Sequence, residues 1–293
     1  MNKTWFLVDT PKKLQRAIDD FNNSSVLSID TEYDSFRYFR EKLCLVQIKA
    51  TAATYIFDPL NHIDLLFLGK YFADKQIVKI LHAADNDIRL LKRDYNFVFE
   101  NIFDTHRAAY LLGFKQLSLE KMINEFLDVE LKKDKKMQRS RWDTRPLADE
   151  QLHYGVQDVT YLPALYKEQL AQLRKKGLEE SAQDAFAKIA ASTWQERTLN
   201  KRGYTKIASY PFLNQQQKDI LKKLYVWRFQ RAKEENRAIF MFLPDKTLTD
   251  LVQCGDNWRE FLPVEKVKLY GDELEQIITG NWSSSFSSQT GIS

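Results

Sequence analysis

Val26-Leu27-Ser28-Ile29-Asp30-Thr31-Glu32 has the composition of a β-strand that carries acidic side chains on one face. A polar loop of Asn and Ser residues, 22–25, stands just before it. Alternate side chains on a strand share a face, so Asp30 and Glu32 point one way while Leu27 and Ile29 point into a core. Two carboxylates on one face repel each other unless a cation lies between them, and such oxygen pairs suit Mg²⁺ or Mn²⁺. The alternative is a polar strand end that faces water.

The composition is that of a soluble globular protein. With 293 residues, 44% hydrophobic and 29% charged, the chain can bury a sizeable core and form more than one domain. The formal net charge of +4 permits a polyanionic partner without requiring one. The two cysteines, Cys44 and Cys254, lie far apart, which argues against a disulfide framework or a cysteine zinc site and fits a reducing compartment.

Membrane and ATP-driven functions find no support in the sequence. No apolar run approaches the length of a membrane span, and the first residues do not form an apolar signal core. There is no Gly-x-x-x-x-Gly-Lys loop for nucleotide phosphates. We therefore expect a cytoplasmic, monomeric protein with no membrane and no ATP among its partners.

The expected elements have the order of an α/β domain. Strands are predicted at residues 4–8, 26–32, 43–48, 55–57, 77–81 and 102–103. Helices are predicted from Thr10 as the cap and Pro11 as the first position, and then at 86–95, 105–112, 119–126, about 149–158 and 163–176. Strands come first and then alternate with helices, which predicts a mixed sheet flanked by helices.

Residues 132–145 interrupt this pattern with basic side chains. Seven cations stand there against two carboxylates, a local surplus of five. A charge run is usually a solvated loop, and the functional alternative is an arm that contacts phosphates. The candidate nucleic-acid contacts are Lys135, Lys136, Arg139, Arg141 and Arg145, and Trp142 is available to stack on a base.

Several separate motifs occur in an order that resembles a known family. They are Ile29-Asp30-Thr31-Glu32, Leu43-Cys44-Leu45-Val46-Gln47-Ile48, Leu81-His82-Ala83-Ala84-Asp85-Asn86-Asp87, Phe103-Asp104-Thr105, Trp142 with Arg145-Pro146-Leu147, and Tyr154-x-x-x-Asp158. Over roughly residues 1–195 the chain is similar to the 3′–5′ exonucleases of the DEDD superfamily, tyrosine subclass, and specifically to the ribonuclease D family. The resemblance implies a ribonuclease H-like fold, two divalent cations, and release of nucleoside 5′-monophosphates from a 3′ end.

Four carboxylates are expected to hold these cations. Hydrolysis of a phosphodiester needs a nucleophilic water and a stabilised leaving oxygen, and two cations about 3.5–4 Å apart supply both. The expected ligands are Asp30 and Glu32 on a strand and Asp87 and Asp158 on helices.

Asp85 competes with Asp87 for the ligand role. The resemblance places the acid five residues after the histidine, here His82, which selects Asp87 and leaves Asp85 as the helix N-cap. We expect His82 to be a structural residue at a strand end and Asp104 to be a helix cap.

The last motif fits two subclasses of the superfamily. Both Tyr154 and His153 have a spacing to Asp158 that one of the subclasses uses. At 100° per residue, Tyr154 lies about 40° from Asp158 around a helix axis and His153 about 140°, which favours Tyr154. An unperturbed pKa near 10 suits the tyrosine to hydrogen bonding with the attacking water more than to acting as a free base.

The C-terminal part reads as a small helical domain. A long helix is expected at about 217–237, a second after 243–248, and shorter ones near 258–262, 264–270 and 273–278. Trp227-Arg228, Ala232 and Asp245-x-x-Leu248 resemble the HRDC module over roughly 211–280. Leu262-Pro263-Val264-Glu265-Lys266 replaces the Gly-rich hairpin of that module, so a bundle that only packs is as plausible as a nucleic-acid binder.

We therefore expect an exonuclease domain at 1–195, a linker at 196–210, an HRDC-like domain at 211–280 and a disordered Ser-rich tail at 281–293. The expected function is metal-dependent 3′–5′ trimming of structured RNAs such as transfer RNA precursors, a substrate class that rests on the resemblance alone. A 3′–5′ DNA exonuclease is the alternative enzyme, because no residue is identified as a reader of the 2′-hydroxyl. A catalytically silent RNA-binding adaptor is a further alternative, against which the presence of all four acids and Tyr154 argues.

Overall fold

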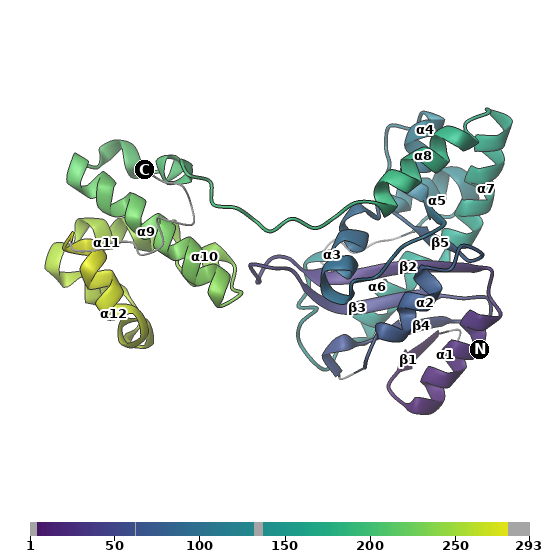
Figure 1. Ribbon diagram of the computed structural model, residues 1–293, viewed down its shortest axis with the longest axis horizontal. Coiled ribbons are helices and arrows are strands. Elements are labelled where there is room, and N and C mark those ends of the chain that lie inside the picture. The colour runs from purple at the N-terminus through teal and green to yellow at the C-terminus, as the bar shows by residue number, and fades with distance from the viewer. Residues whose placement is uncertain (1–4, 62, 132–136, 281–293) are drawn as a thin grey trace. The chain divides into compact units, whose positions relative to one another are not determined.

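The computed structural model describes residues 5–61, 63–131 and 137–280 (Figure 1). The chain divides into two compact units. The first contains the residues up to Asp34 and those from Glu41 to Gln195, and the second contains Ser35–Arg40 and the residues from Glu196 onward. Among the residues described, no helix combines the length and the apolar character that crossing a bilayer requires.

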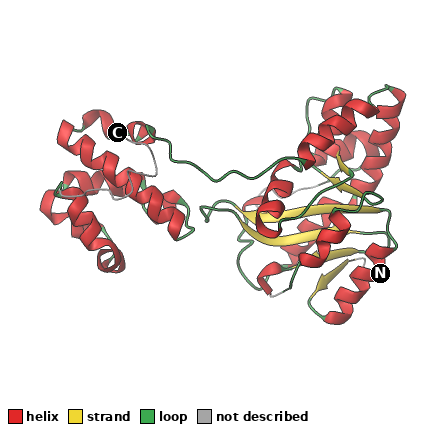
Figure 2. Cartoon of the chain, in the orientation of Figure 1, coloured by secondary structure: helices red, strands yellow, loops and turns green. Residues whose placement is uncertain are grey.

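A six-stranded mixed sheet organises the first unit (Figure 2). Its strands are β1 (Trp5–Val8), β2 (Val26–Asp34), β3 (Lys42–Lys49), β4 (Thr54–Phe57), β5 (Val78–Leu81) and β6 (Ile102–Asp104). Their order is β1-β4-β3-β2-β5-β6, with β2, β3 and β4 antiparallel and the remaining pairs parallel. The predicted mixed sheet is therefore confirmed, and β2 lies inside it with a neighbour on each side.

Helices surround this sheet. They are α1 (Pro11–Asn22), α2 (Gly69–Phe72), α3 (Asp85–Tyr95), α4 (Thr105–Leu112), α5 (Leu119–Leu127), α6 (Asp149–Thr160), α7 (Leu162–Lys175) and α8 (Glu179–Ala190). The sequence did not lead us to expect α8, whose buried positions Ala182, Phe186 and Ile189 nevertheless have helical spacing. The helix that matters most for the site is α6, which packs against β2, β3 and β4.

Helix starts agree with the sequence in two cases and correct it in one. Thr10 caps α1 and Pro11 occupies its first turn, and Asp104 caps α4 by accepting the Arg107 N–H at 2.6 Å, both as predicted. Asp85 is not the cap of α3, because the helix already begins at Asp85 and Ala84 takes the cap position. The Ala84 N–H is held instead by Oδ2 of Asp104 at 2.7 Å, a contact from 20 residues away that the local sequence does not reveal.

In the part of the second unit that the structure describes, all regular secondary structure is helical (Figure 2). Its helices are α9 (Gln215–Glu234), α10 (Ile239–Phe242), α11 (Asp245–Gln253) and α12 (Val264–Ile278). They enclose a core that includes Trp227, Phe242 and Trp258. The two short helices expected at 264–270 and 273–278 are one continuous helix. Gly271 lies inside α12 and does not break it, because a single glycine costs a helix only about 1 kcal/mol relative to alanine and tertiary packing offsets this.

Candidate active site

Three carboxylates from two elements come together at the middle of the sheet. Asp30 and Glu32 on β2 and Asp158 on α6 each offer one oxygen, and these oxygens lie within 4.8 Å of one another. Asp158 is buried, and the two acids of β2 are half-buried. Carboxylates this close repel each other strongly unless a cation lies between them. The donor set consists of hard oxygen atoms, which fits Mg²⁺ or Mn²⁺.

Strand alternation places the two acids of β2 on one face, as predicted. Leu27 and Ile29 are completely buried in the hydrophobic core, while Asp30 and Glu32 both reach Asp158. The regular register between β2 and β3 continues from Ser28 to Glu32 and shifts only after it. The strand is therefore regular over the length that positions the two acids.

Asp87, the fourth predicted ligand, lies beside this cluster. It is in the first turn of α3, and its Oδ1 accepts a hydrogen bond from the hydroxyl of Thr31. Burial raises the pKa of Asp87 to about 6, whereas the Thr31 hydrogen bond acts in the opposite direction. The structure thus brings three of the predicted acids together. The fourth, Asp87, is hydrogen-bonded to Thr31, the residue between Asp30 and Glu32.

A buried carboxylate shapes the turn that leads to Asp87. Asp104 is almost completely buried and binds the N–H groups of Ala84 and Arg107 at 2.7 and 2.6 Å. Burial raises the pKa of Asp104, and the Asp104 charge in turn contributes to the raised pKa of Asp87. His82 lies at the end of β5, where its Nδ1 is 2.8 Å from the Thr105 hydroxyl. Asp104 and His82 are therefore structural supports, as predicted.

Tyr154 faces the acid cluster from α6. It is 6% exposed, and burial is the largest cause of the increase in its pKa. The charges of Asp158, Glu32 and Asp30 raise the pKa further. The phenol therefore keeps its proton near neutral pH and offers a hydrogen-bond donor to the cluster.

His153 points elsewhere. Its ring is exposed and lies edge to face with Trp5, at 5.6 Å between ring centroids and 81° between planes. The predicted separation of Tyr154 from His153 around the helix is thus present in the structure.

Gln47 is a neighbour of the site that the sequence reasoning did not single out. It lies on β3 directly opposite Asp30 and is completely buried. Within the described residues, neither its Oε1 nor its Nε2 has a hydrogen-bond partner. A Cβ at Gly155 of α6 would lie 2.5 Å from that Nε2, so only glycine leaves room for the amide. The available signal was a polar residue in the otherwise apolar run of β3.

The guanidinium of Arg145 forms all of its hydrogen bonds within the protein. It donates twice to the Asp58 carboxylate, at 2.6 Å each, and its other bonds reach the carbonyl oxygens of Cys44, Trp142 and Thr144. A guanidinium has five N–H groups, and these five hydrogen bonds use them all. Arg145, which the sequence suggested as a nucleic-acid contact, therefore has no N–H group left for a phosphate.

Trp142 is also internal. It is 2% exposed, and its ring packs 6.1 Å from that of Tyr154. The expectation that Trp142 stacks on a base is wrong, because the loop that carries it folds back over α6 and buries the ring.

The structure describes only part of the remaining basic segment, residues 132–145. Lys135 and Lys136 fall outside the described residues, as does the side chain of Arg139. Arg141 is exposed and pairs with Asp143 at 2.8 Å.

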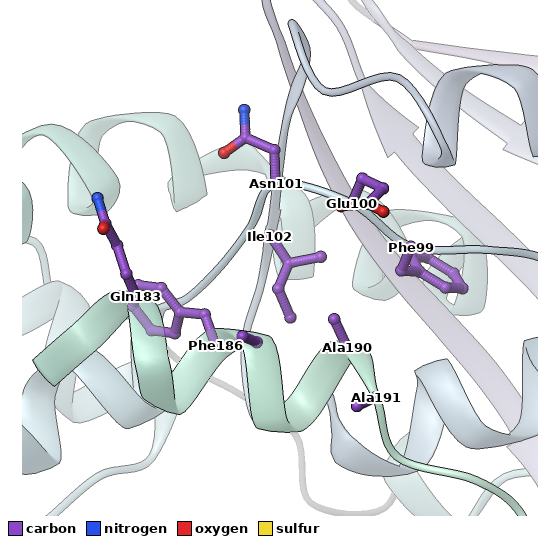
Figure 3. A pocket seen from close by; sticks show the side chains of 9 residues that line it. Phe99, Glu100, Asn101, Ile102, Gln183, Phe186, Ala190 and Ala191 are labelled. Atoms are coloured by element: carbon purple, nitrogen blue, oxygen red, sulfur yellow. The ribbon is translucent and has the colours of Figure 1, made fainter. Parts of the chain in front are cut away.

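The hollow in Figure 3 is separate from these acids. It has a volume of about 470 Å³ and lies between residues 99–102 and one side of α8, where Phe186, Ala190 and Ala191 line it. It contains none of the predicted site residues. The hollow is therefore no part of the acid cluster.

Comparison with known proteins gives two family matches. Residues 6–174 match the family described as 3′–5′ exonuclease, and residues 217–278 match the HRDC domain. The first match spans more than half of the chain and includes all four predicted acids and Tyr154.

Among its relatives, the chain is 29% identical over 254 residues to the exosome complex component 10 homolog of Drosophila melanogaster, covering 84% of this chain and 28% of that protein. It is 28% identical over 247 residues to ribonuclease D of Desulfotalea psychrophila, covering 84% of this chain and 66% of that protein. The chain thus spans less than a third of the length of the exosome relative.

Among solved structures, the catalytic core of RRP6 from Trypanosoma brucei has a TM-score of 0.84 and 21% identity, covering 95% of this chain and 80% of that one. This likeness concerns the fold.

Proposed function

Because this chain belongs to the 3′–5′ exonuclease family, we propose that it is a metal-dependent exoribonuclease that releases nucleoside 5′-monophosphates from RNA 3′ ends. The observation that supports this most is the meeting of Asp30, Glu32 and Asp158 within 4.8 Å. An acid cluster of this kind has a high electrostatic cost unless it serves to hold cations.

The chain's carboxylates provide the ligands for such cations. Asp30, Glu32 and Asp158 would hold one divalent ion, and Asp87 would join them to complete a second site. When bound, two Mg²⁺ or Mn²⁺ ions generate a nucleophilic water and stabilise the charge on the leaving oxygen. The residues fit this role because all of their donor atoms are carboxylate oxygens.

Tyr154 would orient the attacking water. Its raised pKa keeps the hydroxyl protonated, so it can donate a hydrogen bond beside the three acids. Thr31 would fix the carboxylate of Asp87 by the hydrogen bond that it donates. Gln47 offers a buried amide next to Asp30, and we assign it a positioning role.

RNA is the substrate that we favour, because the relatives include proteins named ribonuclease D and exosome complex component 10. Structured RNAs such as transfer RNA precursors are the proposed physiological class. We further propose that the chain is a cytoplasmic monomer; its two free cysteines, Cys44 and Cys254, fit a reducing compartment. DNA is the competing substrate, and the test below decides between the two.

The test uses the full chain with RNA and DNA strands of the same sequence, labelled at the 5′ end. We expect stepwise shortening from the 3′ end with release of nucleoside 5′-monophosphates, in Mg²⁺ or Mn²⁺, and faster on RNA. Internal cleavage, or equal turnover in the presence of a chelator, would overturn the proposal. Faster shortening of DNA would keep the chemistry and change the substrate.

A further inference from the structure

The short segment Ser35–Arg40 is part of the helical unit. Phe39 is 2% exposed and packs edge to face on Phe229 of α9, with 5.2 Å between the ring centroids. The Ala238 N–H donates to the carbonyl of Arg37 at 2.8 Å, and the Arg40 N–H donates to Asn236 at 2.7 Å. One buried ring and two hydrogen bonds thus fix the segment at the start of α10.

This anchoring leaves two aromatic rings exposed side by side. Phe36 is 61% exposed and Phe240 is 50% exposed, and their ring centroids lie 5.0 Å apart. Single exposed apolar residues are common on protein surfaces. Two phenylalanines in contact, each held by a different segment, indicate a surface that meets a partner.

A hollow of about 460 Å³ opens at these rings. Phe36, Phe240, Ile239 and Pro244 provide its apolar lining, and Arg197 provides a cation. Arg197 is exposed, and its guanidinium lies 5.5 Å from the centre of the Phe39 ring.

The charges around this hollow favour an anionic partner. A further guanidinium, that of Arg37, lies 5.7 Å from the centre of the Phe36 ring. The only carboxylate in the lining, that of Asp245, is bound by Arg228 at 2.7 Å. The lining therefore combines ring faces with guanidinium groups and has its negative charge neutralised.

We propose that this hollow, which we call the aromatic site, binds single-stranded RNA: a base stacks on Phe36 or Phe240, and a phosphate contacts Arg197. Bases of any sequence stack on aromatic rings, and guanidinium groups contact the backbone between them. The proposal rests on the proposed function, because it gives the exonuclease a second contact with its substrate. Phe36 lies in the connection between β2 and β3.

A protein partner could also cover exposed rings, since aromatic and Arg side chains are common at protein interfaces. RNA is favoured because every nucleotide presents both a base that stacks on a ring and a phosphate that contacts a guanidinium. The two possibilities differ in what an RNA-binding measurement shows.

The experiment measures binding of the full chain to a fluorescent single-stranded RNA of about 16 nucleotides, in chelator so that no cleavage occurs. Changing both Phe36→Leu and Phe240→Leu keeps the apolar volume and removes the stacking faces. We expect the Kd to rise by about 5- to 150-fold. Changing both to Tyr keeps the rings and should retain the affinity.

Two further variants complete the test. Arg197→Gln should reduce the slope of log Kd against log salt by about 0.7 for the phosphate contact that it removes. The matched control is Phe212→Ala, since Phe212 is 85% exposed in the same unit but does not line the hollow. This variant should bind RNA with the affinity of the wild type.

Wild-type affinity in the double Leu variant, with an unchanged unfolding temperature, would overturn the aromatic site. An equal loss in Phe212→Ala would also overturn it, because the effect would then belong to any exposed ring. Binding is measured without metal, so its outcome does not depend on nucleotide release. If the wild type releases nucleotides and the double Leu variant binds RNA as tightly as the wild type, the proposed function stands and the aromatic site is contradicted.

Discussion

The Thr31 hydroxyl donates a hydrogen bond to Oδ1 of Asp87 and so joins the first turn of α3 to β2. Thr31 lies between Asp30 and Glu32, whose oxygens meet Asp158. β2 therefore carries Asp30 and Glu32 and also holds Asp87 through Thr31. The same contact opposes the effect of burial on the pKa of Asp87, which is nevertheless raised to about 6.

Thr31→Val should weaken the proposed metal site. Loss of the hydroxyl removes the group that lowers the pKa of Asp87, so a larger fraction of this acid stays protonated at a given pH. We expect nucleotide release to need more Mg²⁺ and its pH profile to move to higher pH. Thr31→Ser keeps the hydroxyl and is the matched control. A pH profile of Thr31→Val that equals the wild-type profile would contradict this role.

The raised pKa of Asp87 also fixes the sign of a stability effect in the metal-free protein. The folded state favours the protonated acid, so this contribution to the free energy of unfolding is fully present below about pH 4. It is lost as the pH rises through about 6. Denaturant unfolding in chelator across this range measures the effect, and Asp87→Asn should reduce it. If the wild type and Asp87→Asn showed the same pH dependence of unfolding, the effect would belong to titratable groups other than Asp87.

Tyr154→Phe should slow nucleotide release while the fold is kept. The change removes only a hydroxyl whose hydrogen bond would orient the water, and such a group contributes roughly 10²–10⁴-fold. His153→Gln should cost much less and leave the pH profile near neutrality unchanged, because that ring contacts Trp5. Comparison of initial rates for the two variants checks this. Loss of activity in His153→Gln alone would show that the water-orienting group has been assigned to the wrong residue.

Gly155→Ala should disturb the site through Gln47. The added methyl group would meet Nε2 at 2.5 Å, and Gln47 is completely buried, so α6 or the amide has to move. Overpacking of this kind costs about 1–3 kcal/mol. We expect a lower unfolding temperature and slower nucleotide release. Adding Gln47→Ala should restore stability and not activity if the amide positions Asp30, and recovery of both would mean that Gln47 only fills space.

Arg145 and the exposed cations should behave differently in RNA binding. Arg145→Ala breaks a largely buried pair with Asp58 and should destabilise the fold by about 3 kcal/mol, with little effect on the salt dependence of binding. Neutralising Lys135, Lys136, Arg139 and Arg141 together should instead flatten that dependence, by roughly 0.7 in the log–log slope for each phosphate that these cations neutralise in the wild type. An unchanged slope in the multiple variant would mean that the basic segment is only a solvated loop.

The sequence was sufficient where the signals are local. Alternation along 26–32 predicted that Asp30 and Glu32 share a face, and helical spacing predicted that Tyr154 and Asp158 do. The unpredicted features depend on contacts between distant residues. Arg145 binds Asp58 from 87 positions away, and Ala84 is fixed by Asp104. Nothing local indicated that the residues after β2 join the helical unit, because that depends on where Phe39 is buried.

Release of nucleoside 5′-monophosphates by Asp158→Asn is the most direct test of the central claim. This variant keeps the size of the buried side chain and removes the charge that α6 brings to Asp30 and Glu32. We predict that the wild type releases nucleotides only with Mg²⁺ or Mn²⁺, and that folded Asp158→Asn releases almost none at the same metal concentration. Wild-type rates in the variant, or full turnover of the wild type in chelator, would contradict a catalytic metal centre at these three carboxylates.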